Sequence, residues 1–256
     1  MKTDFATLYT PFEEDLNRDK PWDVYPRPQL KRESFINLNG KWNLEIIRKN
    51  QSVFTGEIIV PFPLESRLSG VNFKKQTNDI MVYTKTVTLS PTDKCFILNF
   101  GAVDQECKVY INGELAGENI GGYLPFSFDI TKLLKRGENE IKVEVLDTLN
   151  LDLAYGKQCK KRGGMWYTET SGIWQTVWLE PVGEKHIADL RILPDVDRNN
   201  LKLTVDVANG DGLLIEARLM DEGKEVALAK GYTGFDMTIC VANPKLWSPE
   251  SPFLYD

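Results

Sequence analysis

The stretch that most constrains the fold runs from Met165 to Pro181 and holds three of the six tryptophans. From Ile173 its residues alternate, which predicts a β-strand, with Ile173, Gln175, Val177 and Leu179 on one face and Trp174, Thr176 and Trp178 on the other. Both faces are largely apolar or aromatic, so we expect something beyond the strand's own sheet to pack on it. Pro181 is expected to end the strand, because proline has no N–H to donate.

Short alternating segments before this stretch predict further strands. They include Trp42, Leu44 and Ile46 after an Asn39-Gly40 turn, Ile58–Val60, Tyr83–Leu89, Cys95–Phe100, Cys107–Ile111, Phe126–Ile130 and Ile141–Val145. Asn112-Gly113 is a strong hairpin signal between Ile111 and Leu115. Since no segment of ten or more residues has a helical period, residues 35–182 are predicted to form an all-β sandwich of two antiparallel sheets.

Two flanking regions complete the predicted organisation. Residues 1–34 are rich in proline and are predicted to form an extended N-terminal arm. Residues 183–256 carry a second set of alternating segments, among them 201–207, 215–219 and 235–239, with a turn at 221–224. This pattern predicts an immunoglobulin-like sandwich, which usually takes about 100 residues. We therefore expect a second domain that is incomplete at its C-terminus, in a fragment of a longer protein.

Composition and charge exclude several classes of protein. The net charge of -6, with Lys and Arg spread along the chain, argues against nucleic acid or an anionic membrane as partner. No segment approaches a membrane span and the first residues contain no apolar leader, so we expect either a cytoplasmic location or a leader that is missing from this sequence. The four cysteines form no C-x-x-C pair and His186 is the single histidine. Free thiols are expected, and no metal site or cofactor is predicted.

Several motifs, in order along nearly the whole chain, resemble the N-terminal part of glycoside hydrolase family 2. The matching stretches are 25–29, 38–42, 60–66, 121–131, 172–181 and 246–250. The resemblance implies a jelly-roll sugar-binding domain, an immunoglobulin-like domain and then a (β/α)8 barrel that holds both catalytic glutamates. It also implies hydrolysis of O-glycosyl bonds in β-galactosides, β-glucuronides or similar compounds by the parent protein.

No catalytic residue is predicted within this chain. A retaining glycosidase holds two carboxyl groups about 5 to 5.5 Å apart across the glycosidic bond. The family's acid follows an asparagine, as Glu140 follows Asn139 here, but Glu140 alternates outward on a predicted strand beside a turn. We therefore expect the chain on its own to be inactive, with scaffolding and substrate contacts as its contribution to the missing barrel.

Four residues are predicted to contact substrate. By motif position, Asn78 and Asp147 resemble an asparagine and an aspartate that reach toward the sugar in β-galactosidases, and their side chains suit hydroxyl groups. The alternative is that both are turn residues bonded to their own backbone. Val82, where the family generally has tryptophan, departs from the pattern near Asn78. Trp166 and Tyr167, beside the basic loop 157–162, are predicted to line the barrel mouth or to pack against the barrel.

The predicted partners are therefore a carbohydrate, bound through the full-length enzyme, and the catalytic barrel. A homo-oligomeric state of the parent protein is left open. Two other classes of function also stay open: a stand-alone carbohydrate-binding module or adhesin, and a structural spacer without a ligand. The apparent truncation of the second domain and the doubly apolar strand at 173–179 favour the accessory region of a glycosidase.

Overall fold

The computed structural model describes residues 11–32, 34–90, 94–161 and 163–256. These residues divide into two compact units, a larger one that comprises the described residues up to Pro26 and Arg32–Pro181, and a smaller one that comprises Arg27–Lys31 and Val182–Asp256. Within the described residues the helices are four short 3-10 turns: η1 (Pro11–Glu13), η2 (Arg67–Ser69), η3 (Thr131–Leu133) and η4 (Val196–Arg198). The all-β class is confirmed.

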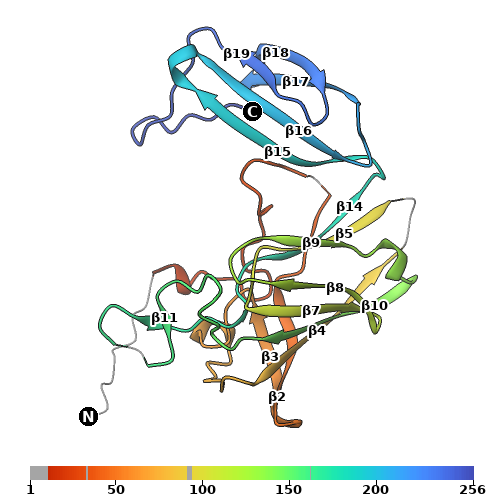
Figure 1. Ribbon diagram of the computed structural model, residues 1–256, viewed down its shortest axis with the longest axis vertical. Coiled ribbons are helices and arrows are strands. Elements are labelled where there is room, and N and C mark those ends of the chain that lie inside the picture. The colour runs from red at the N-terminus through yellow and green to blue at the C-terminus, as the bar shows by residue number, and fades with distance from the viewer. Residues whose placement is uncertain (1–10, 33, 91–93, 162) are drawn as a thin grey trace. The chain divides into compact units, whose positions relative to one another are not determined.

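The larger unit is a β-sandwich with an antiparallel six-stranded sheet in the order β3-β2-β4-β10-β7-β8 (Figure 1). Its strands are β2 (Gly40–Arg48), β3 (Gln51–Val60), β4 (Ile80–Leu89), β7 (Glu106–Ile111), β8 (Glu114–Ile120) and β10 (Gly137–Leu146). The second sheet has the order β1-β14-β5-β9, with β1 (Ile36–Asn37), β5 (Cys95–Phe100), β9 (Phe126–Asp129) and β14 (Val177–Val182). Two small sheets pair β6 (Val103–Asp104) with β13 (Gly172–Ile173), and β11 (Gln158–Cys159) with β12 (Tyr167–Thr168).

The core of the larger unit follows the alternation in the sequence. Trp42, Leu44 and Ile46 of β2 are buried, as are the alternate residues of β10 that face the same way. The hairpin at Asn112-Gly113 is confirmed: both residues have positive φ, 52° and 86°, as a tight turn between right-twisted strands requires. Burial of these apolar faces is what holds the two sheets together.

The stretch 173–179 does not form one strand, and this prediction was wrong. Gly172–Ile173 pairs with β6, whereas Val177–Val182 lies between β1 and β5. The residues between them leave the ladder because the Trp174 indole donates to the carbonyl of Gly122, at 2.8 Å, and Thr176 accepts from Gly101. β14 also continues through Pro181, which lies beyond the residues of β14 that pair with β1, so its missing N–H costs no bond there.

The second face of β14 is covered by the N-terminal segment of the same unit. Trp178 and Glu180 share this face and are 3% and 2% exposed. Tyr25 donates to Oε1 of Glu180 at 2.6 Å, and Nε of Arg32 lies 2.6 Å from Oε2. The two-sided burial expected for this strand is thus met by residues of the described chain. The predicted arm also includes residues 1–10, which lie outside the described residues.

The smaller unit contains a three-stranded sheet, β15-β16-β19, and the hairpin β17-β18. Its strands are β15 (His186–Asp195), β16 (Asn200–Ala208), β17 (Leu214–Asp221), β18 (Lys224–Tyr232) and β19 (Met237–Cys240). Leu203, Val205, Met237 and Ile239 form the buried core. The alternating segment predicted at 235–239 is shorter in the structure, because Phe235 precedes β19 and is 70% exposed. Among the described residues, no helix has the length and apolar character needed to cross a membrane.

Candidate functional site

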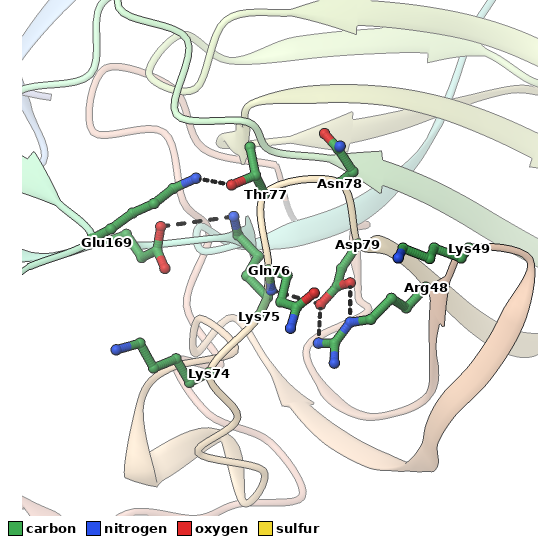
Figure 2. A pocket seen from close by; sticks show the side chains of 10 residues that line it. Arg48, Lys49, Lys74, Lys75, Gln76, Thr77, Asn78, Asp79 and Glu169 are labelled. Carbon is green, nitrogen blue, oxygen red and sulfur yellow. Dashed lines mark hydrogen bonds and ion pairs between the residues drawn. The ribbon is translucent and has the colours of Figure 1, made fainter.

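The loop that leads into β4 forms one wall of a pocket of about 490 Å³. The pocket is lined by Arg48, Lys49, the loop residues Lys74–Asp79, Lys160 and Glu169 (Figure 2). Asn78, one of the predicted substrate contacts, is an exposed residue of this wall. Its side chain is therefore accessible to solvent beside the pocket.

Asp79 fixes the end of this loop. Its carboxylate accepts two hydrogen bonds from the Arg48 guanidinium, at 2.8 and 2.7 Å, and a third from the backbone N–H of Gln76 at 2.7 Å. Burial alone would raise the pKa of Asp79, but these bonds to the charged form hold the pKa below its ordinary value. A bidentate arginine–carboxylate pair is geometrically specific, so the backbone next to Asn78 is held in place.

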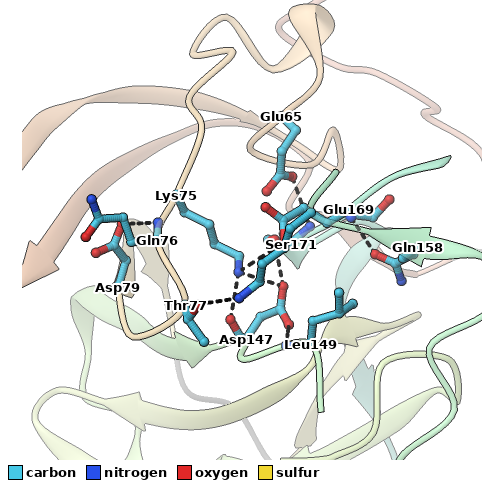
Figure 3. Close-up of polar contacts among 12 residues, drawn as sticks. Glu65, Lys75, Gln76, Thr77, Asp79, Asp147, Leu149, Gln158, Glu169 and Ser171 are labelled. Carbon is cyan, nitrogen blue, oxygen red and sulfur yellow. Dashed lines mark hydrogen bonds and ion pairs between the residues drawn. The ribbon is translucent and has the colours of Figure 1, made fainter. Parts of the chain in front are cut away.

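Lys75 anchors the same loop to two other segments. Its side chain is fully buried, and its ammonium lies 3.0 Å from Oδ2 of Asp147 and 3.8 Å from Oε2 of Glu169 (Figure 3). It also donates to the backbone carbonyl of Asp147 at 2.7 Å. Ser171 donates to Asp147 Oδ2 and the N–H of Leu149 donates to Oδ1, each at 2.7 Å. One buried cation thus serves two buried carboxylates.

Asp147, the second predicted substrate contact, therefore has both carboxylate oxygens engaged inside the protein and is 1% exposed. The alternative that Asp147 is a turn residue bonded to its own backbone has partial support, because its carboxylate accepts from the N–H of Leu149, two residues later. A direct contact between Asp147 and a sugar stays a prediction. In this chain the residue holds Lys75 and, through it, the loop that carries Asn78.

Glu65 borders this network from the segment that follows β3. Its Oε2 accepts a hydrogen bond from the N–H of Ser171 at 3.0 Å. Burial raises the pKa of Glu65 to about 7, against the opposing effects of Ser171 and the charge of Lys75. The side chain therefore titrates near neutral pH.

Glu65→Gln is expected to flatten the pH dependence of stability between about pH 4.5 and 7. Because the pKa of Glu65 is higher in the folded than in the unfolded protein, its contribution is complete below pH 4.5 and is lost as the pH rises through 7. The wild-type chain should lose about 3 kcal/mol from this group over that range. Urea unfolding at pH 4.5, 6 and 8 measures the difference, and parallel curves for both proteins would contradict the assignment.

The predicted aromatic contacts lie outside the pocket that Asn78 lines. Tyr167 is 66% exposed and lines a second pocket, of about 230 Å³, together with Asp104, Tyr123, Lys157, Gln158, Thr168, Thr170 and Trp174. Trp166 is 42% exposed and does not line it. The structure thus brings Asn78 and Asp147 together through Lys75 and places Tyr167 at a separate hollow. Contacts of Trp166 and Tyr167 with substrate stay predictions.

Asp104 and Gln158 are polar groups of the second pocket that the sequence did not single out. Gln158 donates to Asp104 Oδ2 at 3.0 Å and to the Tyr123 hydroxyl at 3.2 Å. Burial raises the pKa of Asp104 to about 6. The stretch Gly121-Gly122-Tyr123 was the sequence signal that could have pointed to this pocket. A β-carbon at Gly122 would lie 2.6 Å from the Asp104 carboxyl, so the pocket leaves no room for a side chain there.

Glu140, the glutamate that follows Asn139, lines neither of the pockets described above. Glu140 is exposed on β10, as expected for a solvated strand residue. Residues 11–32, 34–90, 94–161 and 163–256 contain no cluster of three His, Cys, Asp or Glu side chains suited to a metal ion.

Comparison with known proteins gives matches along the whole chain. Residues 7–181 match the sugar binding domain of "Glycosyl hydrolases family 2", and residues 185–256 match a second domain described as "Glycosyl hydrolases family 2". A putative β-glucuronidase of Formosa agariphila is 33% identical over 185 residues, which are 68% of this chain and 22% of that protein. A β-galactosidase of Lactococcus lactis is 28% identical over 244 residues, 93% of this chain and 23% of that protein. The chain thus spans less than a quarter of the length of these relatives.

Solved structures share the fold. A β-glucuronidase from Ruminococcus gnavus superposes with a TM-score of 0.67 at 22% identity, over 91% of this chain and 42% of that one. A β-D-glucuronidase from Dictyoglomus thermophilum gives the same values.

Proposed function

Because this chain belongs to glycoside hydrolase family 2, we propose that it is the N-terminal, non-catalytic region of a retaining glycosidase that hydrolyses β-galactosides, β-glucuronides or similar O-glycosyl compounds. The observation that carries this proposal is the pair of family matches, which follow one another over residues 7–181 and 185–256. The relatives named as β-galactosidase and β-glucuronidase support the substrate class.

In this proposal the chain supplies a scaffold and substrate contacts, and a (β/α)8 barrel elsewhere in the parent protein supplies both catalytic carboxyl groups. Residues 35–182 act as the sugar-binding domain and residues 183–256 as part of an immunoglobulin-like domain. Asn78 is the best-placed contact, since its amide both donates and accepts and its loop is held by Lys75 and Asp79. The exposed rings of Trp166 and Tyr167 offer apolar faces to sugar rings.

The proposal is tested by comparing the 256-residue chain with the longer parent protein on p-nitrophenyl β-galactoside and β-glucuronide. We expect the parent to release p-nitrophenol with retention of configuration, and the chain alone to show no release above buffer. Hydrolysis by the chain alone, or a parent protein inactive on both substrates, would refute the proposal. Calorimetric titration of the chain alone with galactose, glucuronate and mannose separates the lectin alternative, which requires micromolar binding.

A further inference from the structure

The surroundings of Asn78 are basic in a protein that is acidic overall. The chain has a net charge of -6, yet Arg48, Lys49, Lys74, Lys75 and Lys160 all line the pocket of about 490 Å³. A neighbouring pocket of about 330 Å³ shares Lys74, Lys160 and Glu169 with it and adds Lys161 and Glu65. Positive charge is therefore concentrated on one concave surface of the larger unit.

Two of these cations are paired with carboxylates, of which Asp79 and Glu169 line the pocket and Asp147 does not. Arg48 is paired with Asp79, and Lys75 with Asp147 and Glu169. Within the part of the chain that the structure describes, no carboxylate lies within ion-pair distance of Lys49, Lys74, Lys160 or Lys161. The pocket therefore keeps an excess of positive charge.

Lys160 is bonded to the loop that carries Asn78. Its ammonium donates to the hydroxyl of Thr77, the residue before Asn78. Lys49 and Lys74 stand at other points of the lining and are exposed. Three lysines thus line the same pocket as Asn78 and Thr77.

We propose that this pocket binds an anionic substituent of a glycan, a carboxylate or a sulfate ester, through Lys49, Lys74 and Lys160 with hydrogen bonds from Asn78. The inference rests on the proposed function, because it names the substrate class of the same loop. A cleft lined by one sign of charge attracts ligands of the opposite sign more strongly than a flat surface does. Lysine recognises such groups as a point charge.

A small anionic group fits these observations better than a long polyanion. Nucleic acid needs a basic stripe that follows its backbone, whereas here the unpaired lysines line two neighbouring pockets of an acidic chain. A sugar that carries one charged group also has hydroxyl groups for the polar side chains between the lysines. The site would therefore favour acidic over neutral glycans.

The test is an NMR titration of the ¹⁵N-labelled 256-residue chain with galactose 6-sulfate, glucuronate, galactose and inorganic sulfate. We expect at least one anionic sugar to shift amide signals of residues 48–49, 74–79 and 160, with binding that weakens as salt is added. The triple variant Lys49→Ala, Lys74→Ala, Lys160→Ala should bind roughly tenfold more weakly. The matched control, Lys132→Ala with Lys135→Ala and Lys224→Ala, removes three exposed lysines outside both pockets and should bind as the wild type does.

Each outcome decides the proposal. A response to glucuronate alone or to galactose 6-sulfate alone supports it and identifies the group. Equal binding of galactose, equal binding of inorganic sulfate, or no loss in the triple variant overturns it. Hydrolysis is not part of this readout. If the parent protein cleaves neutral β-galactosides and the pocket binds no anionic sugar, only this inference is refuted. If the parent protein hydrolyses neither substrate, only the proposed function is refuted.

Discussion

Replacing Lys75 with methionine is expected to destabilise the larger unit by about 3–5 kcal/mol, the usual cost of removing one partner of a buried ion pair. Methionine retains most of the length of the side chain but leaves Asp147, which is 1% exposed, and Glu169, which is 5% exposed, without their shared cation. It also removes the bond to the Asp147 carbonyl, which joins the loop 74–79 to the end of β10. A loss of this size is a large part of the stability of a typical domain.

Urea unfolding followed by tryptophan fluorescence measures this loss, because five of the six tryptophans lie in the larger unit. Lys74→Met is the matched control. It removes the same charge one residue earlier from an exposed position, so its effect should stay within about 0.5 kcal/mol. If the two variants unfold at the same urea concentration, the buried network does not stabilise the fold as we infer.

Gly172→Ala is expected to cost about 3 kcal/mol, for two independent reasons. The residue has a φ of +83°, where an L side chain is strained by about 1–2 kcal/mol. A β-carbon there would also lie 2.0 Å from the hydroxyl oxygen of Tyr83. Tyr83 is fully buried in the centre of the sandwich and has no room to move, so overpacking adds about 1–3 kcal/mol.

Gly164→Ala separates these two contributions. Gly164 has a φ of +59°, but a β-carbon there would meet no atom within 4 Å. Its replacement should therefore cost only the backbone strain, about 1 kcal/mol, in the same unfolding experiment. Equal losses for both variants would show that the approach of Gly172 to Tyr83 is not what excludes a side chain.

The predicted strands were right where the alternation of residues reflects one buried face. Trp42, Leu44 and Ile46 are the clearest case, because sheet pairing and burial act on the same period of two. At 173–179 the residues alternate but the backbone does not form one continuous strand. The Trp174 indole donates to the carbonyl of Gly122, 52 residues earlier. A bond between segments so far apart leaves no periodic trace in the sequence.

The candidate site shows the same division. The family resemblance pointed to Asn78 and Asp147, and the two do lie in neighbouring segments. The sequence did not single out Lys75, the residue that joins them. Lys75 sits beside Lys74 in a polar stretch, which is typical of solvated loops. Its burial depends on Asp147, 72 residues away, and on Glu169, whose positions only the folded chain defines.

The division of the chain into two units has a practical consequence for the design of truncated proteins. Because Arg27–Lys31 is grouped with Val182–Asp256, the polypeptide passes from one unit to the other three times, after Pro26, after Lys31 and after Pro181. Arg27 donates to the carbonyl of Ala188. A truncated protein that starts at Val182 would therefore lack a segment that belongs to the smaller unit. A truncated protein, or an exchange of domains between homologues, should therefore keep residues 27–31 together with Val182–Asp256. A circularly permuted chain or a two-chain design would allow this.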